Sequence, residues 1–166
     1  MMKRKITFLI MLVVTLSGSL GSAAVKVGDE APVFEATTLT GQRINSADLK
    51  HNNPMLIVFW ASWCPYCVRD VQKLNNLYES YHPKGLVMVA INPGVNDSVR
   101  KIEQFIKNHG ATYPIVFDNG AAITRKFGVF GAPTYFVVDK SGFIRFRGNE
   151  LPSSIEQLIE MSLALR

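Results

Sequence analysis

The stretch MLIVFWASWCPYC, residues 55–67, decides the fold of this chain. Residues 55–61 form a continuous apolar run, which is typical of a strand buried on both faces of a sheet. Pro65 suits the first position of a helix, where its missing N–H costs no hydrogen bond. Apolar residues then recur at helical spacing as far as Tyr81. The stretch therefore predicts a buried strand followed by a helix that begins at Cys64 and carries Cys67 one turn further along.

These two cysteines are the only ones in the chain. A disulfide between them would close too small a loop to constrain the unfolded chain, so a structural staple is a poor explanation. The N–H groups and dipole at a helix start favour a thiolate at Cys64, and Cys67 lies one turn further in. Thiol–disulfide exchange needs such a pair, with Cys64 as the nucleophile and Cys67 as the resolving thiol.

A zinc half-site is the alternative interpretation of a C-x-x-C pair. Zinc needs two further ligands, and the three histidines, His51, His82 and His109, do not have ligand spacing. The sequence therefore favours a redox pair and indicates no metal and no cofactor.

Strands and helices alternate on both sides of this unit. A hairpin is expected at 34–45 around Thr40-Gly41, with Ser46 capping a short helix at 47–50. Further strands are expected at 86–91, 114–117, 134–138 and 143–147, and helices at 97–109, 121–127 and 152–165. The order βαβαβα followed by ββα predicts an α/β protein with a mixed sheet covered by helices on both faces.

Side-chain patterns predict the orientation of two of these elements. On helix 97–109, Val99, Ile102, Phe105 and Ile106 are expected to face inward. On strand 143–147, Arg145 and Arg147 alternate with apolar residues, which is typical of a strand with one solvated face.

The first 24 residues have the layout of a secretory signal peptide: basic residues 3–5, an apolar run at 6–16 and small residues at 17–24. As a helix the apolar run would be about 16 Å long, well short of a hydrocarbon core of about 30 Å. An uncleaved N-terminal membrane anchor is the alternative. Either way, residues 25–166 are expected to form one domain outside the cytoplasm.

The charge balance excludes one class of partner. The chain has 18 Lys and Arg against 13 Asp and Glu, but Lys3, Arg4 and Lys5 all lie in the leader. The remaining chain has a net charge of only about +2, which gives no support for nucleic-acid binding. Its length of about 140 residues is enough for one well-packed domain.

Two strings resemble a known family. FWASWCPYC (59–67) and GVFGAPTYFVVDKSGFIRFRG (128–148) are similar to the TlpA/ResA/DsbE group of exported thiol–disulfide oxidoreductases. The resemblance implies a thioredoxin-like fold with an N-terminal hairpin extension and a central strand–helix insertion between about 86 and 117. It also implies a monomeric protein-disulfide reductant whose own disulfide is reduced again by a membrane electron donor. Apocytochrome c is a candidate client.

The resemblance also implies which residues surround the dithiol. In the family the proline matching Pro133 is cis and lies against the disulfide. The residues expected to contact a client are Trp63, Pro65, Tyr66, Ala132, Pro133 and Thr134.

Three departures from the family pattern leave the client open. Val58 stands where thioredoxins carry a buried Asp that serves proton transfer. ResA-type members carry a Glu near the loop after the second central strand, but residues 92–95 of this chain include no Glu. The nearest acid, Asp97, is interpreted as a helix N-cap. Thr134 stands where DsbE-type members usually carry Glu.

Other functions remain open at this stage. Cys-Pro-Tyr-Cys is the tetrapeptide that glutaredoxins favour, and residues 27–41 loosely resemble peroxiredoxins. Against these stand Trp63, the leader, the central insertion and the absence of a Pro-x-x-x-Thr cysteine. A non-catalytic binding module of the same fold is a third possibility.

Overall fold

The computed structural model describes residues 24–49 and 52–165, so the predicted leader lies, except for Ala24, outside the described residues. Within these ranges no helix has the length and apolarity needed to cross a membrane. The elements in chain order are β1 (Glu35–Thr37), β2 (Arg43–Asn45), α1 (Ser46–Leu49), β3 (Met55–Phe59), α2 (Pro65–Tyr81), the 3-10 helix η1 (His82–Lys84), β4 (Val87–Asn92), α3 (Val99–His109), β5 (Ile115–Phe117), α4 (Ala122–Lys126), β6 (Thr134–Val138), β7 (Ile144–Gly148) and α5 (Ile155–Ala164).

The central sheet has the strand order β5-β4-β3-β6-β7 and is mixed, as expected. β3 pairs in parallel with β4, and β4 with β5, whereas β6 and β7 add antiparallel strands on the other side. All five residues of β3 are buried, which confirms the central strand predicted from the apolar run. The N-terminal hairpin β1–β2 forms a separate two-stranded sheet, and the predicted insertion is β4 and α3, leading into β5.

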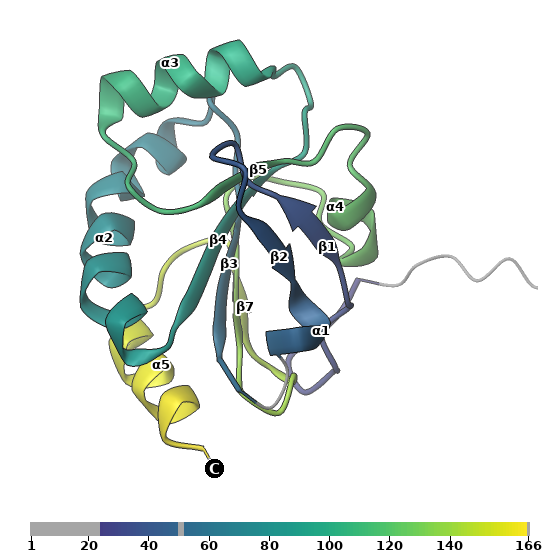
Figure 1. Cartoon of the computed structure of the whole chain (residues 1–166), viewed down its shortest axis with the longest axis vertical. Helices are drawn as coiled ribbons and strands as arrows, with labels where there is room; N and C mark the ends of the chain where they lie inside the picture. Colours follow the sequence, from purple (N-terminus) through teal and green to yellow (C-terminus); the bar gives the residue numbers. More distant parts are fainter. Residues whose placement is uncertain (1–23, 50–51, 166) are drawn as a thin grey trace, which may run out of the picture.

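Helices cover both faces of the sheet (Figure 1). On one side lie α2, α3 and α5, and on the other lie α1, α4 and the β1–β2 hairpin. Alternate residues of β3 divide between two cores, because successive side chains of a strand point to opposite faces. Leu56 and Val58 belong to the core under α2, and Ile57 and Phe59 to the core under α4.

Two segments meet at the carboxyl end of β3: the start of α2 and the loop that precedes β6. Cys64 is the N-cap of α2, and Pro65 is the first residue of that helix, as expected. Across the sheet, β6 begins directly after the Ala132–Pro133 peptide, which is cis and so confirms the isomer implied by the resemblance. Because β3 and β6 are antiparallel neighbours with Phe59 opposite Thr134, the start of α2 and the Pro133 loop meet.

Three local predictions are wrong. Ser46 does not cap α1 but uses its hydroxyl to accept the N–H of Phe34, while Asn45 accepts the N–H of Ala47. The N-cap of α3 is Ser98, whose hydroxyl accepts the N–H of Lys101. Val99 is exposed, because the helix starts two residues later than predicted and this position falls outside the buried stripe.

The two arginines of β7 are not merely solvated side chains. Arg145 forms an ion pair with the carboxylate of Asp139, a residue that is 1% exposed. Arg147 donates to the carbonyl oxygens of Val25 and Gly128. The alternation predicted the strand, but these partners lie elsewhere in the fold and could not be read from it.

Candidate active site

The two thiols lie together beneath the Pro133 loop. Both cysteines are unbonded in this structure and almost fully buried, with exposed fractions of 2% for Cys64 and 4% for Cys67. The backbone N–H of Cys67 donates to Cys64 Sγ at 3.3 Å, as the free N–H groups of a helix start can. The Cys64 thiol donates to the carbonyl oxygen of Ala132 at 3.5 Å. Cys64 is therefore covered by the Pro133 loop instead of by a helical turn.

Cys67 is the thiol that the fold keeps protonated. Burial raises its pKa well above the ordinary value, as predicted, and the contact with the Cys64 thiol adds to this increase. The nearby negative charge of Asp70 acts in the same direction. Releasing the Cys67 proton thus requires an acceptor close by.

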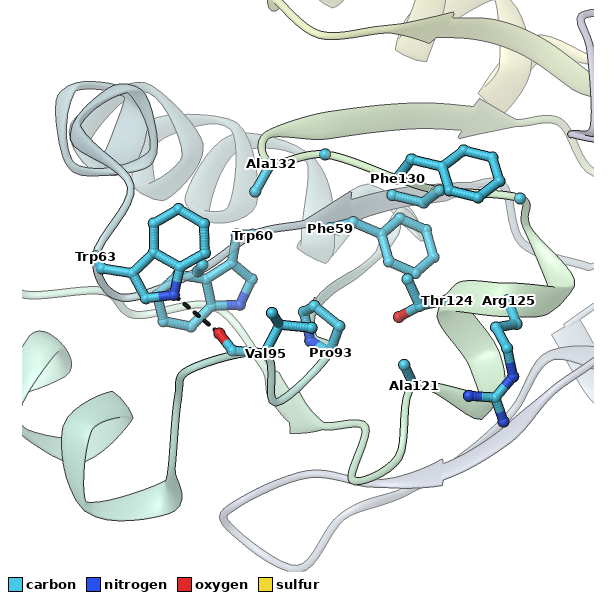
Figure 2. A pocket seen from close by; sticks show the side chains of 14 residues that line it. Phe59, Trp60, Trp63, Pro93, Val95, Ala121, Thr124, Arg125, Phe130 and Ala132 are labelled. Atoms are coloured by element: carbon cyan, nitrogen blue, oxygen red, sulfur yellow. Dashed lines mark hydrogen bonds between the residues drawn. The ribbon is translucent and has the colours of Figure 1, made fainter.

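Trp63 is fixed beside the dithiol although 55% of it is exposed. Its indole Nε1 donates to the carbonyl oxygen of Val95 at 2.9 Å, an interaction drawn in Figure 2. The same loop carries Asp97, whose carboxylate accepts the backbone N–H and the hydroxyl of Ser62. Asp97 is therefore not the predicted N-cap of α3 but a link between the β4–α3 loop and the residue before Trp63.

An apolar groove of about 480 Å³ opens beside Cys64. Trp63 and Val95 lie toward one end and Phe130 toward the other, with Ala132 along its edge (Figure 2). Phe130 is 93% exposed, an unusual placement for an aromatic ring. The groove also reaches Trp60, whose buried indole N–H has no hydrogen-bond partner within residues 24–49 and 52–165. The full lining is Phe59, Trp60, Ala61, Trp63, Pro93, Val95, Ala121, Thr124, Arg125, Gly128, Val129, Phe130, Gly131 and Ala132.

The structure brings only part of the predicted site to this groove. Trp63 and Ala132 line it, whereas Pro65 and Tyr66 are exposed on the first turn of α2. Pro133 and Thr134 are buried. The Thr134 hydroxyl donates to the carbonyl oxygen of Gly131 at 2.8 Å, so it acts within the loop.

A carboxylate that the sequence analysis missed lies behind Cys67. Val58 is buried among apolar side chains, so the strand supplies no acid. Asp70, one helical turn after Cys67, is 8% exposed and accepts the hydroxyl of Tyr135 at 2.7 Å and Nε of Arg69 at 2.9 Å. Its spacing of three residues from Cys67 was the available signal, because such neighbours share one face of a helix.

A metal centre finds no support in the described part of the chain. No group of three or more His, Cys, Asp or Glu side chains there is arranged to hold a metal ion.

Comparison with known proteins agrees with this geometry. The model of the AhpC/TSA family matches residues 27–147. The thiol-disulfide oxidoreductases ResA of Geobacillus thermodenitrificans and Bacillus anthracis are similar in sequence. They are 32% identical over 82% of this chain and 78% of theirs, and 30% identical over 86% of each chain, respectively. A putative thiol:disulfide interchange protein DsbE from Chlorobium tepidum has a similar structure, with a TM-score of 0.75, 27% identity, and coverage of 85% of this chain and all of that one.

The fold and the paired thiols thus define a thioredoxin-like thiol–disulfide oxidoreductase. The chain belongs to the AhpC/TSA family and, within it, to the TlpA/ResA/DsbE-like group.

Proposed function

We propose that this protein reduces disulfide bonds of client proteins outside the cytoplasm, with Cys64 as the nucleophile and Cys67 as the resolving thiol. The observation that carries this proposal is the position of the Cys64 sulfur. It lies 3.5 Å from the carbonyl oxygen of Ala132, a residue that lines the apolar groove, while Cys67 lies one turn further along the helix.

The reaction has two sulfur transfers. The Cys64 thiolate attacks a client disulfide, one client sulfur leaves as a thiolate, and a Cys64–client mixed disulfide forms. Cys67 then attacks the Cys64 sulfur, the mixed disulfide breaks, and the second client sulfur leaves as a thiolate. The client gains two electrons and two protons, and the enzyme is left with a Cys64–Cys67 disulfide.

Asp70 accepts the proton of Cys67 in the second transfer. Cys67 is nucleophilic only as a thiolate, and its raised pKa keeps it protonated at neutral pH. The Asp70 carboxylate lies one turn along the same helix face and is nearly buried, so it can take this proton without bulk water. The departing client thiolate takes its proton from solvent.

The client lies along the groove and the Pro133 loop. The backbone of Ala132 provides strand-like hydrogen bonding for an extended client segment, with Pro133 shaping the loop. Trp63 and Phe130 offer flat apolar surface to the side chains next to the client cysteine. Outside the groove, Tyr66, which is 58% exposed, and the neighbouring Pro65 contact the body of the client. The buried Thr134 holds the loop through its hydroxyl.

Location and partners follow from the leader and the resemblance. Residues 1–24 direct export, leaving residues 25–166 as a monomeric domain that is free or held by an uncleaved anchor. Apocytochrome c is the candidate client, and a membrane dithiol protein returns electrons to the Cys64/Cys67 disulfide. The similarity to proteins named ResA supports this assignment.

The test is the reduction potential of the Cys64/Cys67 couple, combined with reduction of a protein disulfide by the dithiol form. A potential near that of thioredoxin, about −270 mV, is expected for a reductant, and one near that of DsbA, about −120 mV, would contradict the direction. Glutathione-dependent exchange and peroxide turnover, measured in parallel, should both be slow. Fast turnover in either would favour the glutaredoxin or the peroxiredoxin alternative.

A further inference from the structure

The Asp70 carboxylate is held by donors from two residues in different environments. On the solvent side, Arg69 donates through Nε to Oδ1 at 2.9 Å and through Nη2 to Oδ2 at a longer 3.5 Å, from a side chain that is 55% exposed. On the inner side, the hydroxyl of Tyr135 donates to Oδ2 at 2.7 Å, from a residue with no exposed surface. An exposed ion pair is weakened by water, whereas a buried hydrogen bond is not. Tyr135 is therefore the donor that fixes the carboxylate inside the protein.

Tyr135 reaches Asp70 from the strand that carries the Pro133 loop. It lies directly opposite Val58 in the pairing of β3 with β6, and both side chains belong to the core that contains Cys67. The phenol thus stands beside the position where a strand carboxylate is missing. Burial raises the pKa of Tyr135, and its hydrogen bond to Asp70 raises it further, so the phenol remains a donor at neutral pH.

We propose that Tyr135 is a positioning residue for the resolving step: its hydroxyl holds the Asp70 carboxylate in the place where it accepts the proton of Cys67. This rests on the function proposed above. In the step, the Cys67 S–H bond breaks and its proton passes to Asp70. The Cys67 sulfur bonds to the Cys64 sulfur, and the client sulfur leaves with the electron pair of the mixed disulfide.

Other charged or titratable groups near Asp70 have different roles. Arg69 pairs with the carboxylate from the solvent side, and Glu150 acts electrostatically on Arg69. Tyr113 is a second buried phenol that interacts electrostatically with Cys67 and Asp70, but it makes no hydrogen bond to Asp70 within the described residues. Tyr113 is therefore the matched control for Tyr135.

The experiment follows the two steps separately with Ellman's reagent, an aromatic disulfide that releases a coloured thiolate. Attack by Cys64 releases the first thiolate, and attack by Cys67 on the resulting mixed disulfide releases the second. Tyr135→Phe should leave the first phase unchanged and slow the second about tenfold at neutral pH, since a positioned base is worth at least that much. It should also make the second phase accelerate with pH where the wild type does not, because hydroxide replaces the misplaced carboxylate.

Tyr113→Phe should keep the wild-type rate and pH profile. In an Asp70→Asn background, Tyr135→Phe should cause no further slowing, because the two residues act as one unit. A second phase in Tyr135→Phe with the rate and pH profile of the wild type would overturn the inference. A wild type without a second phase would instead refute the proposed function itself.

A second pair of variants covers the case in which Tyr135→Phe does not fold, as judged by circular dichroism. Gln and Met are similar in size, but only Gln can donate to Oδ2 of Asp70. Tyr135→Gln should therefore resolve the mixed disulfide faster than Tyr135→Met. Equal rates would overturn the inference.

Discussion

The carboxylate of Asp97 binds Ser62 twice, accepting its backbone N–H at 2.8 Å and its hydroxyl at 2.7 Å. These bonds join the β4–α3 loop to the residue before Trp63, and the loop returns a bond through the Val95 carbonyl to the Trp63 indole. Asp97 thus helps to fix the positions of Trp63 and Val95, which line the apolar groove.

Asp97→Asn should destabilise the protein by about 1 kcal/mol at neutral pH, since an amide oxygen accepts these bonds less strongly than a carboxylate. Burial acts to raise the pKa of Asp97, but hydrogen bonds from Asn92, Ser62 and Ser98 outweigh it and hold the pKa below the ordinary 3.8. The stabilisation is therefore complete above that value and is lost as pH falls through the lowered pKa. Urea unfolding across the acid range should show a smaller pH dependence in the variant. Asp48→Asn, at an exposed carboxyl of α1, is the control, and equal acid slopes in wild type and Asp97→Asn would contradict this account.

Phe130→Ser should impair recognition of protein clients without affecting stability. The ring is 93% exposed, so its removal should change the free energy of unfolding by less than about 0.5 kcal/mol. The KM for a protein disulfide should rise, while the rate with Ellman's reagent should not change. Phe143→Ser is the matched control, because this partly exposed ring lies at the opposite end of β6 from Cys64. A protein-client KM unaffected by Phe130→Ser would show that the groove does not bind the client.

The reduced protein should lose stability in mild alkali because of Cys67. Its pKa is raised by burial above the ordinary 9.0, so above pH 9 the unfolded chain loses this proton while the folded chain keeps it. The stabilisation is thus complete below pH 9 and falls as pH rises, by up to about 1.4 kcal/mol per pH unit for one proton. Denaturation between about pH 8.5 and 9.5, where unfolded tyrosines are still mostly neutral, should give a shallower decline for Cys67→Ala. Identical declines in the two reduced proteins would exclude this assignment.

The elements around the dithiol were predictable because their signals are local. The apolar run before Cys64 predicted the fully buried strand β3, and Pro65 predicted the start of α2. The strands expected at 134–138 and 143–147 are joined by a turn in which the Gly142 N–H donates to the Asp139 carbonyl oxygen.

The acid behind Cys67 was not predictable in the same way. Asp70 looks like a solvated helix residue, and its burial depends on Tyr135, sixty-five residues further along the chain. The prediction that Asp97 is a helix N-cap was wrong for a related reason. An Asp can cap a helix or join two loops with the same carboxylate, and only the hydrogen-bond partner distinguishes the two roles. The Asp70–Tyr135 bond depends on the pairing of β6 with β3, and the Asp97–Ser62 bonds depend on the pairing of β3 with β4, whose following loops meet. Local sequence patterns encode neither pairing.

The central claim, that Cys64 attacks clients and Cys67 resolves them, is tested most directly by trapping the mixed disulfide. Cys67→Ser, reduced and mixed with a disulfide-bonded client protein, should accumulate a covalent complex whose bond peptide mapping assigns to Cys64. Cys64→Ser under the same conditions should accumulate almost none, because the raised pKa of the remaining Cys67 thiol keeps it protonated. Complexes formed through Cys67 in Cys64→Ser, at the rate seen for Cys67→Ser, would contradict the account.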